Sequence, residues 1–196
     1  MIRPWKLIAS QPLLDTGLFQ VTHDRALSPR TGGACDFHLI HMADWLMVVS
    51  LTREGRLLLV RQYRHGSREA GLEVPGGLHD RDGEGPEQGA VREVAEETGY
   101  GNDGEPLVFL GELRPQPALL SNRVWIYVAR GLRPLARPEL DPGEDIEVVL
   151  IEPHEIPARI ASGEINNAMT VAALSLAHLG GHLGEPRRSP GKENGS

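Results

Sequence analysis

The first part of the chain alternates loosely between apolar and polar residues, which is the period of a β-strand. This pattern predicts strands over residues 6–10, 17–27 and 34–42, and the Pro- and Gly-containing segment 28–33 is typical of a turn. Residues 1–43 are therefore expected to form a small antiparallel sheet. Because so small a sheet is marginal alone, it must pack on the rest of the chain or on a second subunit.

Longer apolar runs, rich in Val and Leu, predict a buried sheet in the next part of the chain. The first two, 45–51 and 57–62, flank the turn segment 53–56 and indicate a hairpin. Strands, a central helix, more strands and two final helices predict an α/β fold, a mixed sheet with helices on its faces. The later strands are expected at 106–113, 123–129 and 145–151, and the final helices at 153–162 and 166–179.

Residues 86–98 carry a strong helix signal. Pro86 suits the first helical position after Gly85 as N-cap, and Gly99 is well placed to end the helix. At about 100° per residue, one face of this helix is predicted to be apolar and the opposite face acidic. The apolar face is formed by Val91, Val94, Ala95 and Thr98, and the acidic face by Glu93, Glu96 and Glu97.

Three carboxylates on one helical face need an explanation, because like charges at this spacing destabilise a helix by about 0.2–0.5 kcal/mol per pair. Arg92 is the neighbouring cation in the sequence that can relieve them, through Glu96. Two interpretations remain open at this point. The face is either a solvated acidic surface or a site for Mg²⁺ or Mn²⁺, which bind carboxylate oxygens.

The composition is that of an ordinary globular protein, with 196 residues, 40% of them apolar and 24% charged. A formal net charge of −7 argues against a general nucleic-acid binder, and no apolar run is long enough for a transmembrane helix. Cys35 is the single cysteine, and the N-terminus lacks the apolar core of a signal peptide. We expect a cytoplasmic protein with N-terminal strands over 1–43, a main domain over 44–183 and a disordered tail over 184–196.

Residues 92–100 read Arg-Glu-Val-Ala-Glu-Glu-Thr-Gly-Tyr, with Glu84 eight residues before Arg92 and the pair Gly76-Gly77 further upstream. This pattern resembles the Nudix box, whose fixed residues recur at fixed spacing. The chain departs from the family pattern in one place, since six residues rather than five separate Gly77 from Glu84. Because loops tolerate insertions, the extra residue concerns the shape of the loop and not the helix.

The resemblance implies an α/β/α sandwich and metal-dependent hydrolysis of a nucleoside diphosphate linked to another group. It also implies that Glu93 and Glu97 are the principal ligands of Mg²⁺ or Mn²⁺ and that Glu96 is a further ligand. The backbone carbonyl of Gly76 would complete the metal site, and Arg92 would orient Glu96. Glu97 is thus expected to be both catalytic and metal-binding. A divalent cation offsets the charge of a pyrophosphate and acidifies a water molecule.

Outside the box, the chain resembles the ADP-ribose pyrophosphatase branch of the family. The resemblance rests on segment 61–64, on Pro115 in a proline-rich loop and on a later acidic loop. In that branch a glutamate of the later loop is the general base. Glu144 is the expected base here and Asp145 and Glu147 are alternatives, while an acidic loop that is merely solvated is the plainer interpretation.

The same resemblance predicts two contacts with the substrate and a partner. Arg64 is expected to bind phosphate, because guanidinium forks match phosphate oxygens, and Trp5 is expected to stack on adenine. The plainer alternatives are a surface arginine and a packing tryptophan. Asn122 stands where many members of this branch carry an acid, and it can donate to a sugar or phosphate or cap a turn. The family's common dimer, with exchanged N-terminal sheets, predicts a homodimer.

Together these features predict hydrolysis of the pyrophosphate bond of ADP-ribose or a related nucleoside diphosphate sugar, releasing a nucleoside monophosphate and a sugar phosphate. The alternatives are hydrolysis of another nucleotide, such as a dinucleotide, a GDP-sugar or an NTP, and a non-catalytic nucleotide sensor. A sensor would carry damaged metal ligands, whereas Glu93, Glu96 and Glu97 are all present. The expected partner is a small-molecule nucleotide, with no nucleic acid and no membrane.

Overall fold

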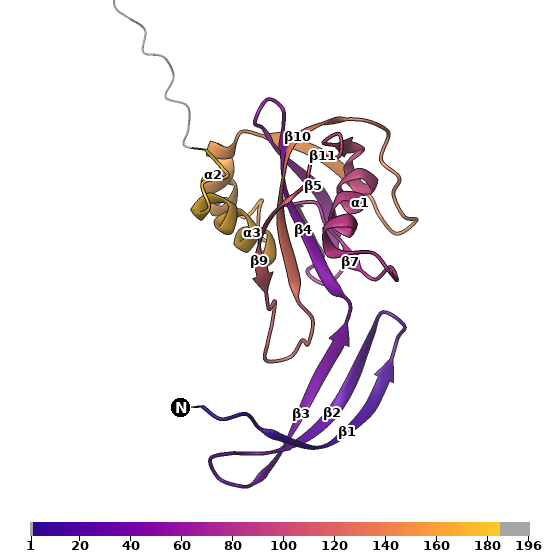
Figure 1. The fold of residues 1–196 in the computed structure, drawn as a ribbon, viewed down its shortest axis with the longest axis vertical. Coiled ribbons are helices and arrows are strands. Elements are labelled where there is room, and N and C mark those ends of the chain that lie inside the picture. Colours follow the sequence, from indigo (N-terminus) through magenta and orange to yellow (C-terminus); the bar gives the residue numbers. More distant parts are fainter. Residues whose placement is uncertain (1, 185–196) are drawn as a thin grey trace, which may run out of the picture.

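The computed structural model describes residues 2–184, and these residues form two separate β-sheets with helices beside the larger one (Figure 1). Almost all of the predicted tail, residues 185–196, lies outside the described part. No helix within residues 2–184 has the length and apolar character needed to cross a bilayer. The smaller sheet extends away from the main domain, so the molecule is elongated in Figure 1.

The small antiparallel sheet predicted for the N-terminus is present. Its strands are β1 (Lys6–Asp15), β2 (Phe19–Leu27) and β3 (Ala34–Met42), paired antiparallel in the order β1-β2-β3. β1 is longer than the expected 6–10 and is exposed along its whole length. Pairing with β2 supplies the hydrogen bonds for the extra residues, although two register shifts interrupt this ladder. Proline at position 12 is tolerated because β1 is an edge strand.

The larger sheet has eight strands and is mixed, as the sequence predicts. Its main path is β11-β5-β4-β10-β8, while β6 pairs with β5, β7 with β4 and β9 with β10. The β10–β4 pair is parallel and the other pairs are antiparallel. The strands are β4 (Asp44–Thr52), β5 (Leu57–Arg64), β6 (Glu69–Glu73), β7 (Leu78–His79), β8 (Tyr100–Gly101), β9 (Val108–Leu113), β10 (Val124–Pro134) and β11 (Ile146–Ile151).

Helices cover both faces of this sheet, which confirms the α/β/α expectation. Helix α1 (Pro86–Thr98) lies on one face, and α2 (Ile156–Ala161) and α3 (Ala168–Leu179) lie on the other, with the 3₁₀ turn η1 (Pro153–Glu155) before α2 (Figure 1). The alternation of β4 explains the two layers, because successive side chains point to opposite faces. Val48 packs with the apolar side chains of α1, whereas Val49 packs with those of α3.

The helix α1 has the predicted bounds and caps, but the predicted division of its faces is partly wrong. Gly99 ends the helix in the left-handed conformation, with φ 71°, and Pro86 begins it. Val91, placed on the apolar face, is exposed, whereas Glu97, placed on the acidic face, is only 4% exposed. The side of α1 that packs on the sheet carries Ala90 and Val94. Glu97 lies about one turn after Val94 on that same side of the helix and is therefore buried.

Candidate active site

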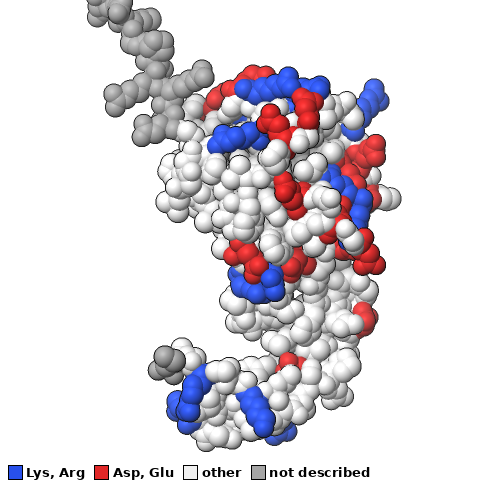
Figure 2. Space-filling view, in the orientation of Figure 1, with Lys and Arg blue, Asp and Glu red and all other residues white. Residues whose placement is uncertain are grey.

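A cleft of about 1240 Å³ lies where β4 begins, beside α1, the start of α3 and two loops. It is lined by nine acidic side chains and three arginines. Acidic side chains, with some basic ones among them, also gather on the surface near α1 in Figure 2. Because the lining is strongly negative, an anionic substrate can enter this cleft only together with cations.

The glycine segment before α1 runs alongside β4. The N–H of Val48 donates to the carbonyl of Pro75 (2.9 Å) and that of Leu46 to the carbonyl of Gly77 (2.9 Å). In an extended segment the polar groups of the intervening residue point the other way, so the N–H and carbonyl of Gly76 face α1 and the cleft. The Gly76 N–H donates to Glu97 Oε2 at 2.9 Å. A side chain at Gly76 would overlap the Leu46 carbonyl, so only glycine fits here.

Arg92 gathers the carboxylates of the motif around one guanidinium. It donates to both oxygens of Glu84, at 2.9 and 3.0 Å, and to one oxygen each of Glu93 (2.7 Å) and Glu96 (2.8 Å). The Arg92 side chain is 14% exposed, so these charge-assisted bonds lie largely out of water. Arg81 adds a contact to the second oxygen of Glu96 at 3.0 Å. Glu84 therefore serves to hold Arg92, which in turn orients Glu93 and Glu96.

Burial changes the acidity of two of these glutamates. Desolvation raises the pKa of Glu97 to about 8, and the N–H of Gly76 acts in the opposite direction. Burial also raises the pKa of Glu93, against the stabilising effect of Arg92 on the charged form. The negative charge of Glu144, which lines the same cleft, raises both pKa values further. A bound cation would relieve this crowding.

The donor set fits a hard divalent cation, although the side chains are arranged around Arg92. Among residues 2–184, no three acidic, His or Cys side chains converge in the way that holds a metal ion. The reason is visible in the contacts, because Arg92 binds Glu93 and Glu96 while Glu97 accepts from Gly76. Oxygen-only donors, two of them buried and destabilised as anions, nevertheless match the chemistry of Mg²⁺ or Mn²⁺.

Arg64, the predicted phosphate ligand, lines the cleft and is already paired. Its Nε and Nη2 groups donate to Oε1 and Oε2 of Glu73, both at 2.9 Å. Glu73 is 4% exposed and was missed by the sequence analysis. The signal that could have found it is a single acid between the apolar residues Leu72 and Val74, since a carboxylate in an apolar, buried segment needs a partner.

The loop between β10 and β11, which includes the later acidic segment, contributes Glu139, Asp141 and Glu144 to the lining of the cleft. Glu144 lines it, whereas the two alternatives, Asp145 and Glu147, are not among the lining residues. Glu147 instead lies 3.4 Å from Arg61 and is 70% exposed. The Glu144 carboxylate accepts from the N–H of Asp141 at 3.0 Å, which holds the loop against itself. Of the three candidate bases, Glu144 is the one that faces the glutamates of α1.

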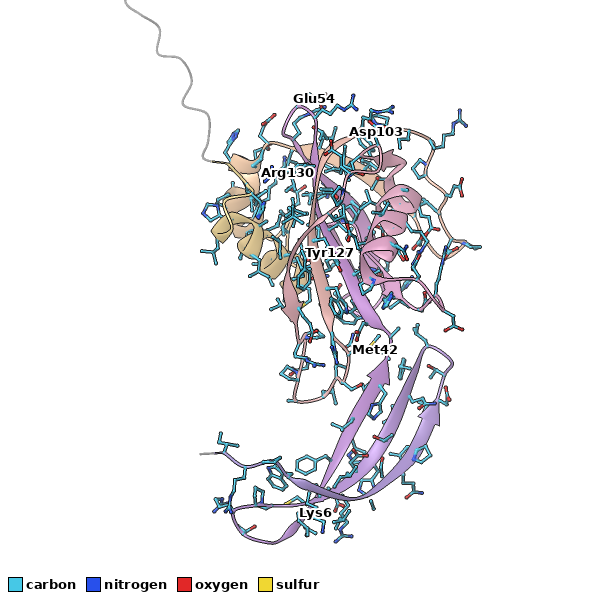
Figure 3. The ribbon with its side chains drawn as sticks, viewed as in Figure 1. Lys6, Met42, Glu54, Asp103, Tyr127 and Arg130 are labelled. Atoms are coloured by element: carbon cyan, nitrogen blue, oxygen red, sulfur yellow. The ribbon has the colours of Figure 1, made fainter. Side chains whose placement is uncertain are left out.

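Trp5 lies far from this cleft within one chain. Its ring packs edge-on against Phe37 of β3, with centroids 5.3 Å apart. The next residue, Lys6, is at the end of the small sheet that points away from the main domain, beyond Met42 (Figure 3). Contact between Trp5 and a nucleotide would therefore require the cleft of another subunit.

Two departures from the motif pattern also have structural explanations. The extra residue lies in the loop between β7 and α1, which His79 closes through a 2.8 Å contact with the Glu84 carbonyl. Asn122 is buried and donates to the Ala43 carbonyl at 3.3 Å, so it joins the proline-rich loop to the start of β4 and does not line the cleft. Within the described residues its Oδ1 accepts no hydrogen bond.

Comparisons with known proteins agree with this geometry. A family model described as the NUDIX domain matches residues 43–171. The ADP-ribose pyrophosphatase of Mycobacterium tuberculosis is 29% identical over 175 residues, which cover 89% of this chain and 83% of that protein. The ADP-ribose pyrophosphatase of Bacillus subtilis is 30% identical over 133 residues, covering 67% and 70%. The methanol dehydrogenase activator of Bacillus methanolicus is 29% identical with the same coverage.

A solved structure has the same fold. The crystal structure of an ADP compounds hydrolase superposes with a TM-score of 0.79, covering 92% of this chain and 96% of that one. The two sequences are 24% identical in this superposition, so the likeness concerns the fold. It includes the small sheet, because the coverage extends well beyond the residues that the family model matches.

Proposed function

Because the chain belongs to the Nudix hydrolase family, we propose that it hydrolyses the pyrophosphate bond of ADP-ribose or a related nucleoside diphosphate sugar. The products would be a nucleoside monophosphate and a sugar phosphate. The observation that carries the proposal is the single cleft shared by the glutamates of α1, Arg64 and Glu144. Two relatives named ADP-ribose pyrophosphatase support the choice of substrate.

In the proposed site, Glu93, Glu96, Glu97 and the Gly76 carbonyl hold Mg²⁺ or Mn²⁺. When bound, the cation offsets the charge of the pyrophosphate and acidifies a water molecule. The fit is supported by the oxygen donors of Glu93 and the buried Glu97, which line one cleft and whose pKa values are raised by burial. Gly77 leaves room for this arrangement, because a Cβ there would come within 2.5 Å of the Glu93 carboxylate.

The protein's own groups divide the remaining work. Glu144 accepts the proton of the attacking water, a role supported by its place in the lining of the cleft that the glutamates of α1 share. Arg64 holds phosphate oxygens through the N–H groups that Glu73 leaves free. Arg92 keeps Glu93 and Glu96 aligned, as a partner of metal ligands does.

We also propose that the active form is a homodimer in which the small sheet packs on a second subunit. Exposed apolar side chains support this, because Leu7, Ile8, Leu13 and Leu14 lie on the edge strand β1 and Phe37 lies on the opposite edge strand β3. Much of this sheet is uncharged in Figure 2. In such a dimer Trp5 could reach the partner's nucleotide and stack on adenine. A monomer by multi-angle light scattering would contradict this proposal.

A substrate panel tests the proposed function. ADP-ribose, other nucleoside diphosphate sugars, GDP-sugars, dinucleotides and NTPs are incubated with Mg²⁺ or Mn²⁺, and released nucleoside monophosphate is measured. We expect the highest kcat/KM for ADP-ribose or a related sugar, and loss of most turnover in Glu97→Gln. Preference for a dinucleotide, a GDP-sugar or an NTP would favour the alternative that the protein hydrolyses another nucleotide. Binding without turnover would favour a non-catalytic sensor. Near-wild-type turnover by Glu97→Gln would exclude the metal assignment.

A further inference from the structure

One buried charged side chain, Glu73, has no part in the chemistry proposed above. It is the last residue of β6 and pairs in register with Val60 of β5, while Arg64 lies four positions further along β5. Val60 and Arg64 are an even number of residues apart, so their side chains lie on the same face of β5 as Glu73. The long Arg64 side chain extends along the strand toward Val60 and so reaches Glu73. The resulting ion pair joins two residues of the cleft lining, the buried Glu73 and Arg64, which is the proposed phosphate ligand.

The geometry of the pair decides which donors of Arg64 remain. A guanidinium has five N–H groups in a fixed fork, and Glu73 takes one from Nε and one from Nη2. Both N–H groups of Nη1 and the second N–H of Nη2 are left, and they point away from Glu73. The second N–H of Nη2 and one N–H of Nη1 form an end-on fork that matches two phosphate oxygens. Arg64 lines the same cleft as Glu97, a proposed metal ligand, and Glu144, the proposed base.

Glu73 is itself held in place by Asn167, at the start of α3. The Nδ2 group of Asn167 donates to Glu73 Oε2 at 2.8 Å, while Asn167 Oδ1 accepts from the N–H groups of Met169 and Thr170 at the start of α3. Asn167 is therefore both the N-cap of α3 and the anchor of Glu73. Because the carboxylate is fixed by β6 and α3 together, it can hold the half-exposed Arg64 side chain in one rotamer.

We propose that Glu73 is a positioning residue that aims Arg64 at the phosphates of the substrate, with Asn167 as its anchor. This inference rests on the proposed function of the cleft. Arg64 would bind phosphate in the ground state and the transition state alike, so loss of Glu73 should act on KM more than on kcat. Without Glu73 the Arg64 side chain is free to move and must be ordered when the substrate binds. That loss of side-chain entropy weakens binding about two- to twelvefold.

The test uses Glu73→Gln, which keeps the volume and removes the charge, and Glu164→Gln as the matched control. Glu164 pairs with Arg61 of the same strand β5 but lies outside the cleft. Binding of inorganic pyrophosphate with Mg²⁺ is measured by calorimetry, and KM and kcat are measured with ADP-ribose. We expect Glu73→Gln to weaken the binding of pyrophosphate, and to raise the KM for ADP-ribose, by about five- to tenfold. Glu164→Gln should lower the Tm and leave both values unchanged.

A double-substitution cycle separates positioning from general damage. Arg64→Met removes the side chain through which Glu73 acts, so adding Glu73→Gln to it should weaken pyrophosphate binding no further. Additive losses would overturn the proposal. If Glu73→Gln does not fold, Asn167→Ser provides a second route, because serine keeps the N-cap of α3 and removes the donor to Glu73.

The outcomes distinguish this inference from the proposed function. A wild-type protein that binds pyrophosphate in a Glu73-dependent way but turns over nothing in the substrate panel would retain the positioning role and end the hydrolase proposal. Turnover of ADP-ribose with unchanged pyrophosphate affinity and KM in Glu73→Gln would overturn the positioning role alone. Absence of pyrophosphate binding by the wild type would also overturn it.

Discussion

Arg92 is the side chain on which the acidic site depends, and its replacement by methionine gives the sharpest test. Arg92→Met keeps the apolar stem and removes four hydrogen bonds to three carboxylates. Those carboxylates are only 13–33% exposed. Without the guanidinium they repel one another in a poorly solvated place.

The expected loss of stability can be bounded. A hydrogen bond to a charged group contributes about 1.5–3 kcal/mol, so four independent bonds would give at least about 6 kcal/mol. The four share one guanidinium and are not additive, and removing one partner of a buried pair costs about 3–5 kcal/mol. Since these carboxylates keep some contact with water, we expect about 3 kcal/mol. For a chain of this length that lowers the Tm by about 6–12 °C.

Urea unfolding in EDTA and in Mg²⁺ measures the effect. Arg133→Met is the matched control, because Arg133 pairs with Asp103 on the surface, where both side chains are more than 40% exposed, and such pairs contribute about 0–1 kcal/mol. Mg²⁺ should stabilise Arg92→Met less than the wild type, since Glu93 and Glu96 are no longer held in place for the cation. An Arg92→Met loss no larger than that of Arg133→Met would refute the reasoning.

Three further predictions follow from the same cleft. Glu144→Gln should lower the kcat for ADP-ribose by about 100-fold or more and leave KM within a few-fold of the wild-type value. An unchanged kcat would mean that another residue is the general base. Burial raises the pKa of Glu97 to about 8, so the folded protein holds a proton that the unfolded chain has lost above about pH 4.5. Stability in EDTA should therefore fall as the pH rises from about 5 to about 8, by at most about 5 kcal/mol; urea unfolding checks this, with Glu97→Gln giving a flatter profile. Gly77→Ala should displace Glu93, because the new Cβ would lie 2.5 Å from its carboxylate; turnover and Mg²⁺-dependent thermal stabilisation should both fall, and wild-type values would show that Glu93 has room to move.

Local sequence determined the elements and the identity of the chemistry. The bounds of α1 follow from Pro86 and Gly99, whose backbone preferences act within one turn of the chain. Most strands of both sheets follow from apolar runs and turn residues, whereas β6, β7 and β8 were not predicted. The mixed sheet with helices on its faces follows from the order of the elements. The motif that contains Arg92 indicated the family, because its residues lie close together along the chain and keep a fixed spacing.

Tertiary structure alone decided how these side chains are used. Helical periodicity placed Glu97 opposite the apolar face, but where the sheet meets α1 depends on distant strands, and that contact buries Glu97. Glu73 meets Arg64 because β5 and β6 pair in one particular register, and Glu144 reaches the cleft from a loop nearly fifty residues after α1. Trp5 lies outside its own cleft because the small sheet extends away from the main domain. Each of these depends on contacts between residues far apart in the chain, which spacing and period along one segment do not encode.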